Sequence, residues 1–455
     1  MTVFLNFGYL ISVCFFVLGL KLLSKPDSAK RGNYLSMFGM FLAVVITLTF
    51  NTIETFKIIA ISLFIGSVIG IIASKKVKLT AMPELVALFN GAGGLSSFLV
   101  AYGSLLLVPD FSLASALLCF ISVVVGCVTF SGSLVAWAKL SGVISSKPVF
   151  IFGQKIILCV LFFSLFAVSI YFCYGFSFFE SILIITVISI ILGILIVMAI
   201  GGGDMPVVIA LLNSYSGIAA SLAGLVVGNV LLVIVGILVG ASGLILTNIM
   251  CKAMNRKLSN VIFGGFGSSS LNSSQNATSK VVNEVAIDEA YLMLEAARKV
   301  MIIPGYGLAV SQAQHVVREL GDLLNKNNCD VEYAIHPVAG RMPGHMNVLL
   351  AESNIDYGYL IELEDANEKM PSVDVAIVIG ANDVVNPDSY ENPDSQLYSM
   401  PIIDVVKAQT VIVLKRSMKP GFAGVENPLF YKDNTRMLFG DAKSSLTKIV
   451  QEFKS

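Results

Sequence analysis

Charged residues are scarce in this sequence of 455 residues: they make up 13% of the chain, whereas soluble domains carry about 25%. The seven cysteines include no C-x-x-C pair and six lie in apolar runs, which disfavours a disulfide framework and a thiolate metal site. The only histidines, His315, His336 and His345, lack the spacing of a zinc site. A single soluble domain is therefore excluded, and no metal is expected.

Apolar residues make up 56% of the chain and gather in residues 1–258. A bilayer-spanning helix needs about 20 such residues, and the sequence predicts nine: about 3–23, 34–50, 56–74, 82–107, 112–138, 155–174, 178–200, 206–227 and 229–251. The first lacks a basic start and an A-x-A cleavage site, so it is predicted to be a retained span. Lysine and arginine follow the first, third, fifth and ninth runs, which predicts an outside N-terminus and a cytoplasmic chain after residue 252.

A motif is repeated within the apolar half at an offset of 123 residues. The pattern M-P-x-x-x-A-L-x-N-x-x-x-G begins at Met82 and again at Met205. Each Met-Pro step is predicted to open a helix, which places Asn90 and Asn213 two turns deeper in the hydrocarbon. Buried amides need partners there. They either join neighbouring helices or line a polar path across the membrane.

Two acidic residues flank the repeated Met-Pro steps on the predicted cytoplasmic side. Glu84 follows the first step, and Asp204 precedes the second after three glycines. A charge at the bilayer centre costs at least roughly 3 kcal/mol and is usually kept for function. Asp204 is therefore interpreted either as a helix N-cap or as a titratable gate at the mouth of the path.

The composition changes after residue 258: residues 1–258 carry a net charge of +8 and the remainder −8. Residues 259–284 are rich in glycine and serine and are predicted to form a flexible linker. Beyond them, six β-rich runs alternate with helical stretches at 300–303, 331–335, 359–363, 375–379, 411–414 and 437–439. We thus predict a polytopic helical membrane domain, 1–258, followed by a Rossmann-like α/β domain, 285–455, with a six-stranded parallel sheet.

The first β-rich run leads directly into a glycine turn, P-G-Y-G-L-A-V. Gly305 is expected to allow the tight turn and Gly307 to let a phosphate approach the backbone. Val310 would replace the third glycine of the dinucleotide motif, where helix meets strand. This position between strand and helix favours a dinucleotide site, and an ordinary turn is the alternative.

Two strand ends distinguish NADP from NAD. An NAD site would carry an acid after the second strand, but the chain has His336-Pro337 there. The fifth run instead ends in Lys415-Arg416-Ser417, which suits a doubly charged 2′-phosphate. These residues favour NADP, with a solvated basic pair as the alternative. The glycine-rich segment 418–435 that follows is predicted to close as a lid.

Five longer motifs resemble the β subunit of proton-translocating NAD(P) transhydrogenase. They are GYGLAVSQAQH (305–315), HPVAGRMPGHMNVLLAE (336–352), IGANDVVNP (379–387), VLKRSMKPGFAGVENPLF (413–430) and GDMPVVIALLNSYSG (203–217). The resemblance implies an oxidoreductase and translocase that passes hydride from NADH on a partner α subunit to NADP+ held here, coupled to inward proton translocation. It also implies an α/β hetero-oligomer with two β chains, no nucleic acid, and a bacterial inner membrane location with a cytoplasmic nucleotide domain.

The resemblance further implies roles for individual residues. Asp383 would be the acid that couples protonation to nucleotide occupancy, and the proton path would include Asn90, Asp204 and Asn213. Some relatives carry histidine in place of Asn90, so an imidazole, if the path needs one, would come from another chain. Contacts to NADP(H) are implied for Gly305, Tyr306, Gly307, Leu308, Ala309, Val310, Arg341, Met342, Pro343, Gly380, Ala381, Asn382, Asp383, Lys415, Arg416, Ser417, Gly424, Asn427, Gly440 and Asp441.

A protein of another class also fits nine spans and an NADP site: an ion transporter or channel gated by a nucleotide-sensing Rossmann domain. A transhydrogenase needs a second nucleotide site, which this chain lacks, whereas a gated channel does not. A neighbouring reading frame with its own dinucleotide domain would favour the transhydrogenase. A membrane-anchored NADPH sensor without transport is a third alternative, which the polar repeat disfavours.

Overall fold

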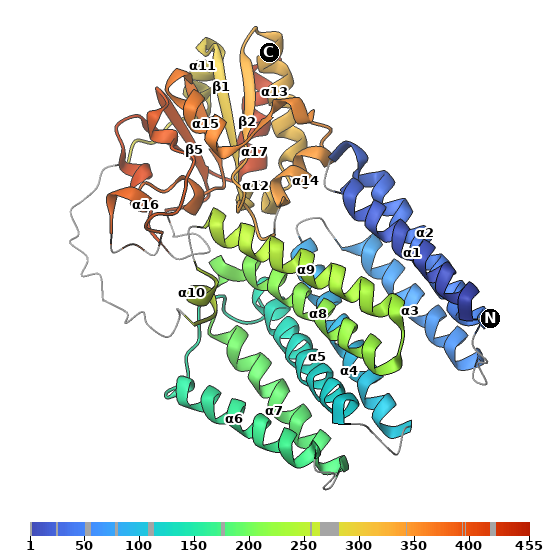
Figure 1. The fold of residues 1–455 in the computed structure, drawn as a ribbon. Helices are drawn as coiled ribbons and strands as arrows, with labels where there is room; N and C mark the ends of the chain where they lie inside the picture. The colour runs from blue at the N-terminus through green and yellow to red at the C-terminus, as the bar shows by residue number, and fades with distance from the viewer. Residues whose placement is uncertain are drawn as a thin grey trace.

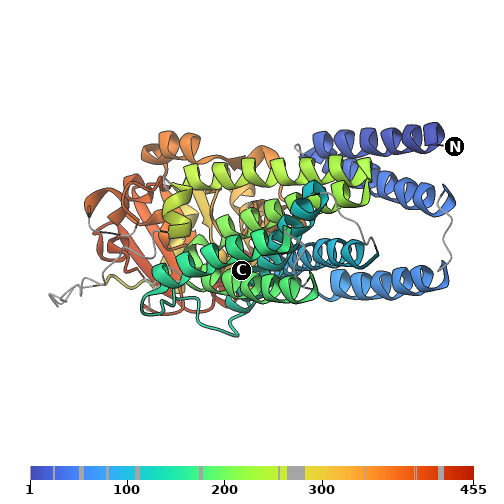
Figure 2. The same ribbon diagram turned by 60° about the horizontal axis from the view of Figure 1, so that its bottom comes forward.

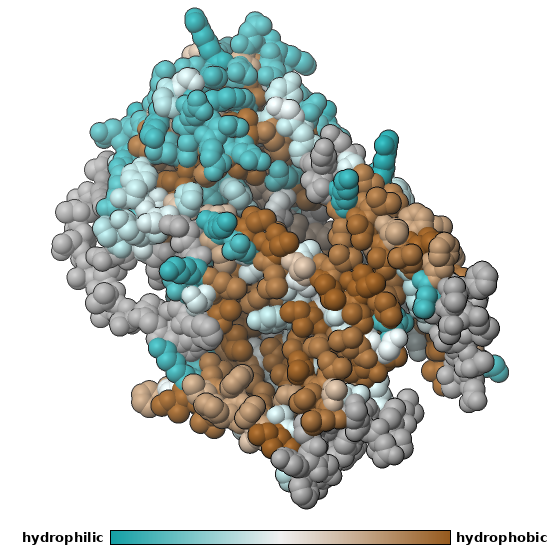
Figure 3. All heavy atoms as spheres, in the orientation of Figure 1, coloured by the Kyte–Doolittle hydropathy of each residue, from teal (hydrophilic) through white to brown (hydrophobic). Residues whose placement is uncertain are grey.

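A bundle of long helices carries a domain built on a parallel sheet at one end (Figure 1). The structure is a computed structural model. It describes all residues except 1, 24–25, 51–55, 78–80, 108–112, 174–177, 255–256, 264–281, 343, 394, 396 and 419–424. The outer surface of the bundle is largely apolar, whereas the sheet domain is largely hydrophilic (Figure 3). The two halves therefore face different solvents, as the charge distribution predicts.

Nine helices of the described chain are long and apolar enough to cross a membrane, which confirms the predicted number. They are α1 (Thr2–Leu23), α2 (Pro26–Phe50), α3 (Phe56–Lys76), α4 (Met82–Leu107), α5 (Leu113–Leu140), α6 (Gln154–Cys173), α7 (Phe178–Met198), α8 (Met205–Val227) and α9 (Val230–Ala253). The largest boundary difference is at α2, which begins at residue 26 instead of about 34. Its polar first turns continue the helix beyond the apolar run.

The N-terminus and the sheet domain lie at opposite ends of the bundle, which agrees with an odd number of spans (Figures 1 and 2). The repeated motif opens α4 and α8, which pack against each other. The glycine that ends each copy of the motif allows close approach to the next helix. A Cβ on Gly94 would lie 2.8 Å from the carbonyl oxygen of Gly126 in α5, and one on Gly217 would lie 2.4 Å from the amide nitrogen of Gly240 in α9. Each repeat therefore builds a closely packed helical hairpin.

The sheet has six parallel strands in the order β3-β2-β1-β4-β5-β6. They are β1 (Lys299–Pro304), β2 (Asp330–Ala334), β3 (Leu360–Ile361), β4 (Val375–Ile379), β5 (Thr410–Lys415) and β6 (Thr435–Phe439). All five residues of β4 are buried, as expected for a parallel strand covered on both faces. The six predicted strands are confirmed, although β3 has only two residues.

Helices and loops cover both faces of the sheet. One core lies beneath α11 (Ile287–Ala296), α12 (Tyr306–Ser311), α13 (Gln314–Lys326), α14 (His345–Glu352) and α17 (Ala442–Glu452), and the other beneath α15 (Leu363–Lys369) and the loops around it. A further short helix, α16 (Asp388–Glu391), lies at the edge of the domain (Figure 1). The order of the strands reverses between β1 and β4, and a ligand crevice is expected at that switch point.

Both ends of the predicted linker belong to ordered elements. Residues 258–263 form α10 (Leu258–Phe263), and Glu284 makes a parallel bridge to Met437 at the edge of the sheet. The linker prediction was wrong for these ends, because their side chains and backbone find partners in the two halves. Residues 264–281, which hold most of the predicted linker, lie outside the described residues.

Candidate functional site

Two glycine turns interlock at the switch point of the sheet. The amide of Gly305 donates to Ile379 (2.9 Å), and that of Gly307 donates to the carbonyl of Gly380 (2.9 Å). A Cβ on Gly305 would lie 2.4 Å from Cα of Ala381, and one on Gly307 would lie 2.6 Å from Cα of Gly380. The turns after β1 and β4 therefore need glycine to pack on each other, a reason beyond the phosphate approach inferred from the motif.

The interpretation of Val310 was wrong. Its side chain is 45% exposed, whereas Leu308 and Ala309 are fully buried and occupy the contact between α12 and the sheet. The helix that carries Val310 is short. Gln312 adopts a left-handed conformation (φ 52°) that ends α12, and α13 starts at Gln314.

Lys415 and Asp383 bring buried charges together at the ends of β5 and β4. The ammonium of Lys415 lies 4.3 Å from the ring centroid of Phe430, and its Nζ is buried without a hydrogen-bond partner among the described residues. Burial raises the pKa of Asp383, while Asn382 and Lys415 act against that rise. Burial likewise lowers the pKa of Lys415, and Asp383 opposes it. A buried cation without a hydrogen-bond acceptor fits an anionic group such as a nucleotide phosphate.

Arg416 points to a different partner. Its side chain is 62% exposed and pairs with Asp441 (Nη2 to Oδ2, 2.9 Å) after β6. Asp441 in turn caps α17 by accepting from the amide of Ser444 (3.3 Å). Burial alone would raise the pKa of Asp441, but the Ser444 amide and the Arg416 guanidinium lower it. The strand β5 ends at Lys415, so Arg416 lies in the bend beyond it and turns toward Asp441. The exposed Ser417 follows Arg416.

Amide side chains fasten the loop after β4 to the segment before β6. Asn382 donates to the Asp383 carboxylate (2.9 Å) and to the carbonyl of Val425 (3.2 Å), while Asn427 donates back to the carbonyl of Asn382 (2.9 Å). Asn386 adds a bond to the carbonyl of Glu426 (2.9 Å). The described end of the predicted lid is thus anchored to the site. Residues 419–424, including Gly424, lie outside the described residues.

Arg341, on the loop after β2, lies where the sheet domain meets the helices. Its guanidinium stacks 4.2 Å from the ring centroid of Tyr306 and donates through Nη1 to the carbonyl of Leu140, the last residue of α5. Burial lowers the pKa of Arg341, an effect opposed by Tyr306 and by Glu84 of α4. Val338 of the same loop packs against the apolar cluster around the start of α8. This loop therefore joins the glycine turn after β1 to the ends of the long helices.

Most of the residues assigned to NADP(H) gather at one edge of the sheet. The turns after β1, β4, β5 and β6 bring together Gly305 to Val310, Gly380 to Asp383, Lys415 to Ser417 and Gly440 to Asp441, with Asn427 beside them. Arg341 and Met342 lie at the junction with the helices, and Pro343 lies outside the described residues.

The predicted proton-path residues lie on α8 and its neighbour. Asn90 is buried in α4 and donates to the carbonyl of Ile209 in α8 (3.2 Å), so it joins the two repeat helices. Asn213 lies partly buried on α8. Asp204 holds the N-cap position of α8, but its side chain makes no capping hydrogen bond. The N-cap interpretation of Asp204 is therefore not supported.

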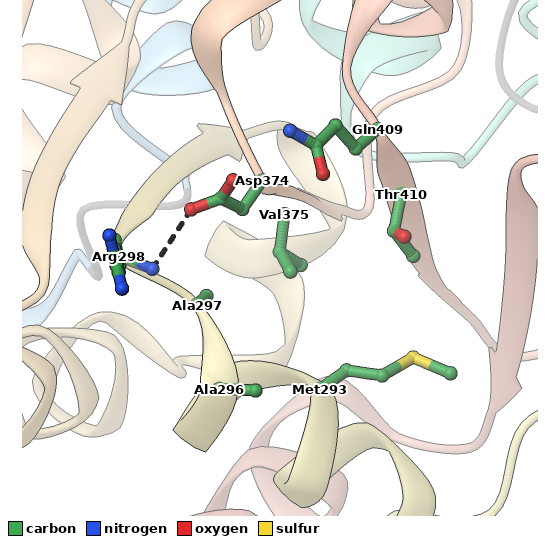
Figure 4. Close-up of a pocket in the computed structure, with 8 residues that line it drawn as sticks. All are labelled: Met293, Ala296, Ala297, Arg298, Asp374, Val375, Gln409 and Thr410. Atoms are coloured by element: carbon green, nitrogen blue, oxygen red, sulfur yellow. Dashed lines mark hydrogen bonds between the residues drawn. The ribbon is translucent and has the colours of Figure 1, made fainter.

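A hollow elsewhere on the sheet domain does not include any of the assigned residues (Figure 4). It lies at the amino-terminal edge of β1, β4 and β5, opposite the glycine turns. Asp374 at its rim accepts from the amides of Arg298 (2.9 Å) and Lys299 (3.0 Å). This carboxylate closes the start of β1 and is interpreted as structural.

Two buried side chains at the junction between the helices and the sheet domain could not be singled out from the sequence. Lys139 is buried at the end of α5, where it was counted only as a cytoplasmic charge. His345, for which the sequence excluded only a zinc site, is buried beside Tyr306, and its Nδ1 accepts from the amide of Arg341 (3.1 Å). Burial lowers the pKa of His345 to about 4. The available signal was the run of turn residues between His336 and His345, which indicates a tightly folded loop.

The strand order, the interlocked glycine turns and the cations after β5, together with nine described helices long enough to cross a membrane, are typical of a membrane protein with a dinucleotide-binding domain. Comparison with known proteins makes this assignment specific. The family model for the NAD(P) transhydrogenase beta subunit matches residues 5–452. The NAD(P) transhydrogenase subunit beta of Rhodospirillum rubrum is 46% identical over 454 residues, 98% of each chain, and a protein of the same name from a defined strain of that organism gives the same values. The chain belongs to the NAD(P) transhydrogenase beta subunit family.

Proposed function

We propose that the chain holds NADP(H) in the crevice between the turns after β1, β4 and β5, and that hydride passes from NADH on an α subunit to this NADP+. Proton movement inward across the membrane is coupled to that transfer. Exchange between two nicotinamides has almost no driving force of its own, whereas one proton crossing about 100 mV contributes roughly 2.3 kcal/mol. The proton gradient therefore sets the direction toward NADPH.

The observation that carries the proposal is the pair of diverging cations at the end of β5. The exposed Arg416, followed by Ser417, is placed for the 2′-phosphate that distinguishes NADP from NAD. The buried ammonium of Lys415 faces inward and attracts a second anionic group of the nucleotide. Bound NADP+ supplies the nicotinamide carbon that accepts the hydride. The glycine turns and the bonded amides of Asn382 and Asn427 shape the cleft around it.

Asp383 links the nucleotide to protons. Burial already favours its neutral form, and an anionic nucleotide beside it favours that form further. Binding of NADP(H) then takes up a proton at this carboxyl group. Release of that proton weakens the site, which gives protons arriving through the helices a means to control how tightly the nucleotide is held.

The membrane path runs along α4 and α8 in this proposal. Asn90 and Asn213 supply buried amides at equivalent positions of the repeat, and Asp204 supplies a carboxylate at the mouth of α8 next to the sheet domain. Neither amide titrates, so a partner helix provides any imidazole that the path needs.

The proposed organisation follows from the same residues. Residues 1–258 form the proton-translocating domain and 285–455 the NADP(H) domain, and the linker is confined to the segment between α10 and Glu284. The protein lies in a bacterial inner membrane with the nucleotide domain in the cytoplasm, and two β chains join their α subunits in one hetero-oligomer. The basic residues at the helix ends beside the nucleotide domain support this orientation.

The test reconstitutes the chain with its α partner in sealed vesicles and follows NADPH formation from NADH with a proton gradient and after its collapse. The expected result is a rate and an NADPH/NADP+ ratio that fall when an uncoupler is added. A pH-sensitive dye in the lumen measures proton movement in the same vesicles. Hydride transfer that is indifferent to the uncoupler and moves no protons would overturn the proposal.

A further inference from the structure

A buried lysine at the end of α5 bonds to the end of α7, and the proposed function assigns it no part. Lys139 is 1% exposed, and its ammonium donates to three carbonyls at the end of α7: Val197 (3.2 Å), Met198 (2.7 Å) and Ile200 (2.7 Å). The last carbonyls of a helix lack intrahelical donors and carry partial negative charge, so a cation is stabilised there. One side chain thus bonds to three carbonyls of this helix end, two of which, those of Val197 and Met198, also accept from backbone amides.

The neighbouring loop reinforces this attachment. The side chain of Gln154 donates to the carbonyl of Leu195 (2.8 Å), and the amide of Val149 donates to the carbonyl of Met198 (3.0 Å). On the other side of the turn, the amide of Gly202 donates to Ser146 (2.8 Å). The turn between α7 and α8, which ends at Asp204, is therefore held by α5 and the 141–153 segment as one unit.

The residue after Lys139 contacts the nucleotide domain. The carbonyl of Leu140 accepts from Arg341, whose guanidinium stacks on Tyr306 of the glycine turn. Leu140 also belongs to the apolar cluster that includes Ile200 and Met205 and that Val338 covers. A continuous set of contacts therefore runs from the nucleotide turn through Arg341 and the end of α5 to the turn that carries Asp204.

We propose that Lys139 is a positioning residue for energy coupling. It fixes the α7–α8 turn to the end of α5, so that docking of the 338–345 loop on Leu140 sets the position of Asp204. Without the ammonium, the 338–345 loop still docks on Leu140 and nucleotide still binds. The α7–α8 turn, however, no longer changes position when the loop docks. This inference rests on the proposed function, because it assigns the residue that transmits nucleotide occupancy to the proton path.

The test replaces Lys139 by methionine, which keeps length and removes the cation, and by arginine, which keeps the cation. Lys147→Met, on the exposed 141–153 segment, is the matched control. Each variant is reconstituted with the α partner in sealed vesicles. Lys139→Met is expected to keep at least half of the hydride transfer measured with uncoupler but to lose fivefold or more of the protons moved per hydride. Lys139→Arg is expected to restore part of that ratio, and Lys147→Met to match the unaltered chain.

Hydrogen exchange provides a second measurement that does not depend on activity. In the unaltered complex, NADPH is expected to change amide exchange in residues 199–204. In Lys139→Met this response should disappear, while exchange within α8 beyond its first turn stays the same. Faster exchange throughout α5, α7 and α8 would show that the lysine only maintains the fold and would overturn the inference, as would an unchanged proton-to-hydride ratio. Uncoupled transfer by the unaltered chain would instead overturn the proposed function, and the inference with it.

Discussion

The two halves of the chain satisfy their buried polar groups in different ways. Among the described helices of the membrane half, polar side chains bond almost entirely to backbone carbonyls, as Asn90 does to Ile209 and Ser214 to Gly240; the pair Tyr9–Thr47 is an exception. In the nucleotide domain, side chains also pair with each other, as Arg416 does with Asp441. Helices in lipid offer few polar partners besides backbone. Side chains of opposite charge therefore pair on the surface of the sheet domain, as Lys432 also does with Glu391.

The largest loss of stability is expected from substituting glycines at close backbone contacts. One such substitution should destabilise the helical half, and another should destabilise the sheet domain. Gly217→Ala would push the new Cβ to 2.4 Å from the backbone of α9, and Gly305→Ala would bring it as close to Ala381. Backbone cannot yield as a flexible side chain can, so each change is expected to cost about 3 kcal/mol or more. Thermal unfolding of the purified protein measures the loss.

The matched control for that experiment lies on α3. Gly66→Ala meets nothing within 4 Å and removes a residue that disfavours helices, so it is expected to leave stability unchanged or slightly raised. If Gly217→Ala were as harmless as Gly66→Ala, the close packing of α8 and α9 would be wrong.

Acid should weaken the nucleotide domain before the helices. Burial lowers the pKa of both His336 and His345 to about 4. Below about pH 6.5, the two histidines are therefore protonated in the unfolded chain but remain neutral in the folded domain. The stability of the domain above that pH is lost as the pH falls toward 4. The loss is on the order of 2–3 kcal/mol for each histidine. Reactivity of Cys329, the only cysteine of this domain, reports its unfolding in urea at pH 7 and pH 5.

A histidine variant separates this cause from general acid denaturation. His336→Gln should flatten the pH dependence of the urea midpoint by about half, since a glutamine does not titrate. An unchanged pH dependence in the variant would show that other groups bind the protons.

Removal of one cation should change cofactor choice without disturbing the membrane half. Arg416→Met is expected to weaken NADP(H) binding about 10- to 100-fold, the cost of a lost bond to a charged group, and to leave NAD(H) binding little changed. Calorimetry with both nucleotides measures the two affinities. Arg298→Met, at the opposite edge of the sheet, is the control. Equal losses for both nucleotides would mean that Arg416 does not recognise the 2′-phosphate.

The smallest expected effect concerns pH and nucleotide affinity. Because burial raises the pKa of Asp383, NADP(H) should bind most tightly when this carboxyl is protonated and less tightly as the pH rises through that value. Asp383→Asn keeps the neutral form at every pH. Its affinity should stay constant where that of the unaltered chain falls by up to about tenfold. A persistent decline in the asparagine variant would assign the proton to another group.

The sequence was most informative where structure depends on local pattern. Each spanning helix follows from one apolar run, and five of the strands from compact β-rich runs, because burial on both faces leaves a continuous apolar signal. The site edge was predictable for the same reason, since the carboxyl ends of parallel strands share one side of the sheet. The short β3 was overestimated because Tyr359 belongs to the preceding 3₁₀ turn and Leu363 already begins α15.

Features that depend on residues distant in the chain could not be predicted in this way. The partners of Lys139 lie 58 to 61 positions away, and that of Asn90 lies 119 positions away. The divergence of Lys415 and Arg416 depends on where β5 ends, and the exposure of Val310 on where α12 ends. A shift of one residue in β5 would reverse which side of the sheet Lys415 faces, and a shift of one residue in α12 would turn Val310 by about a quarter of the helix circumference.

The end of α5 also carries the only tryptophan of the chain, Trp137, two residues before Lys139. Its indole packs against the apolar cluster that Val338 of the nucleotide domain covers. The tryptophan fluorescence of this chain, excited at wavelengths that tyrosine does not absorb, therefore originates at the boundary between its halves. A stopped-flow record of that emission after mixing with NADPH would time the rearrangement of the junction with no label attached.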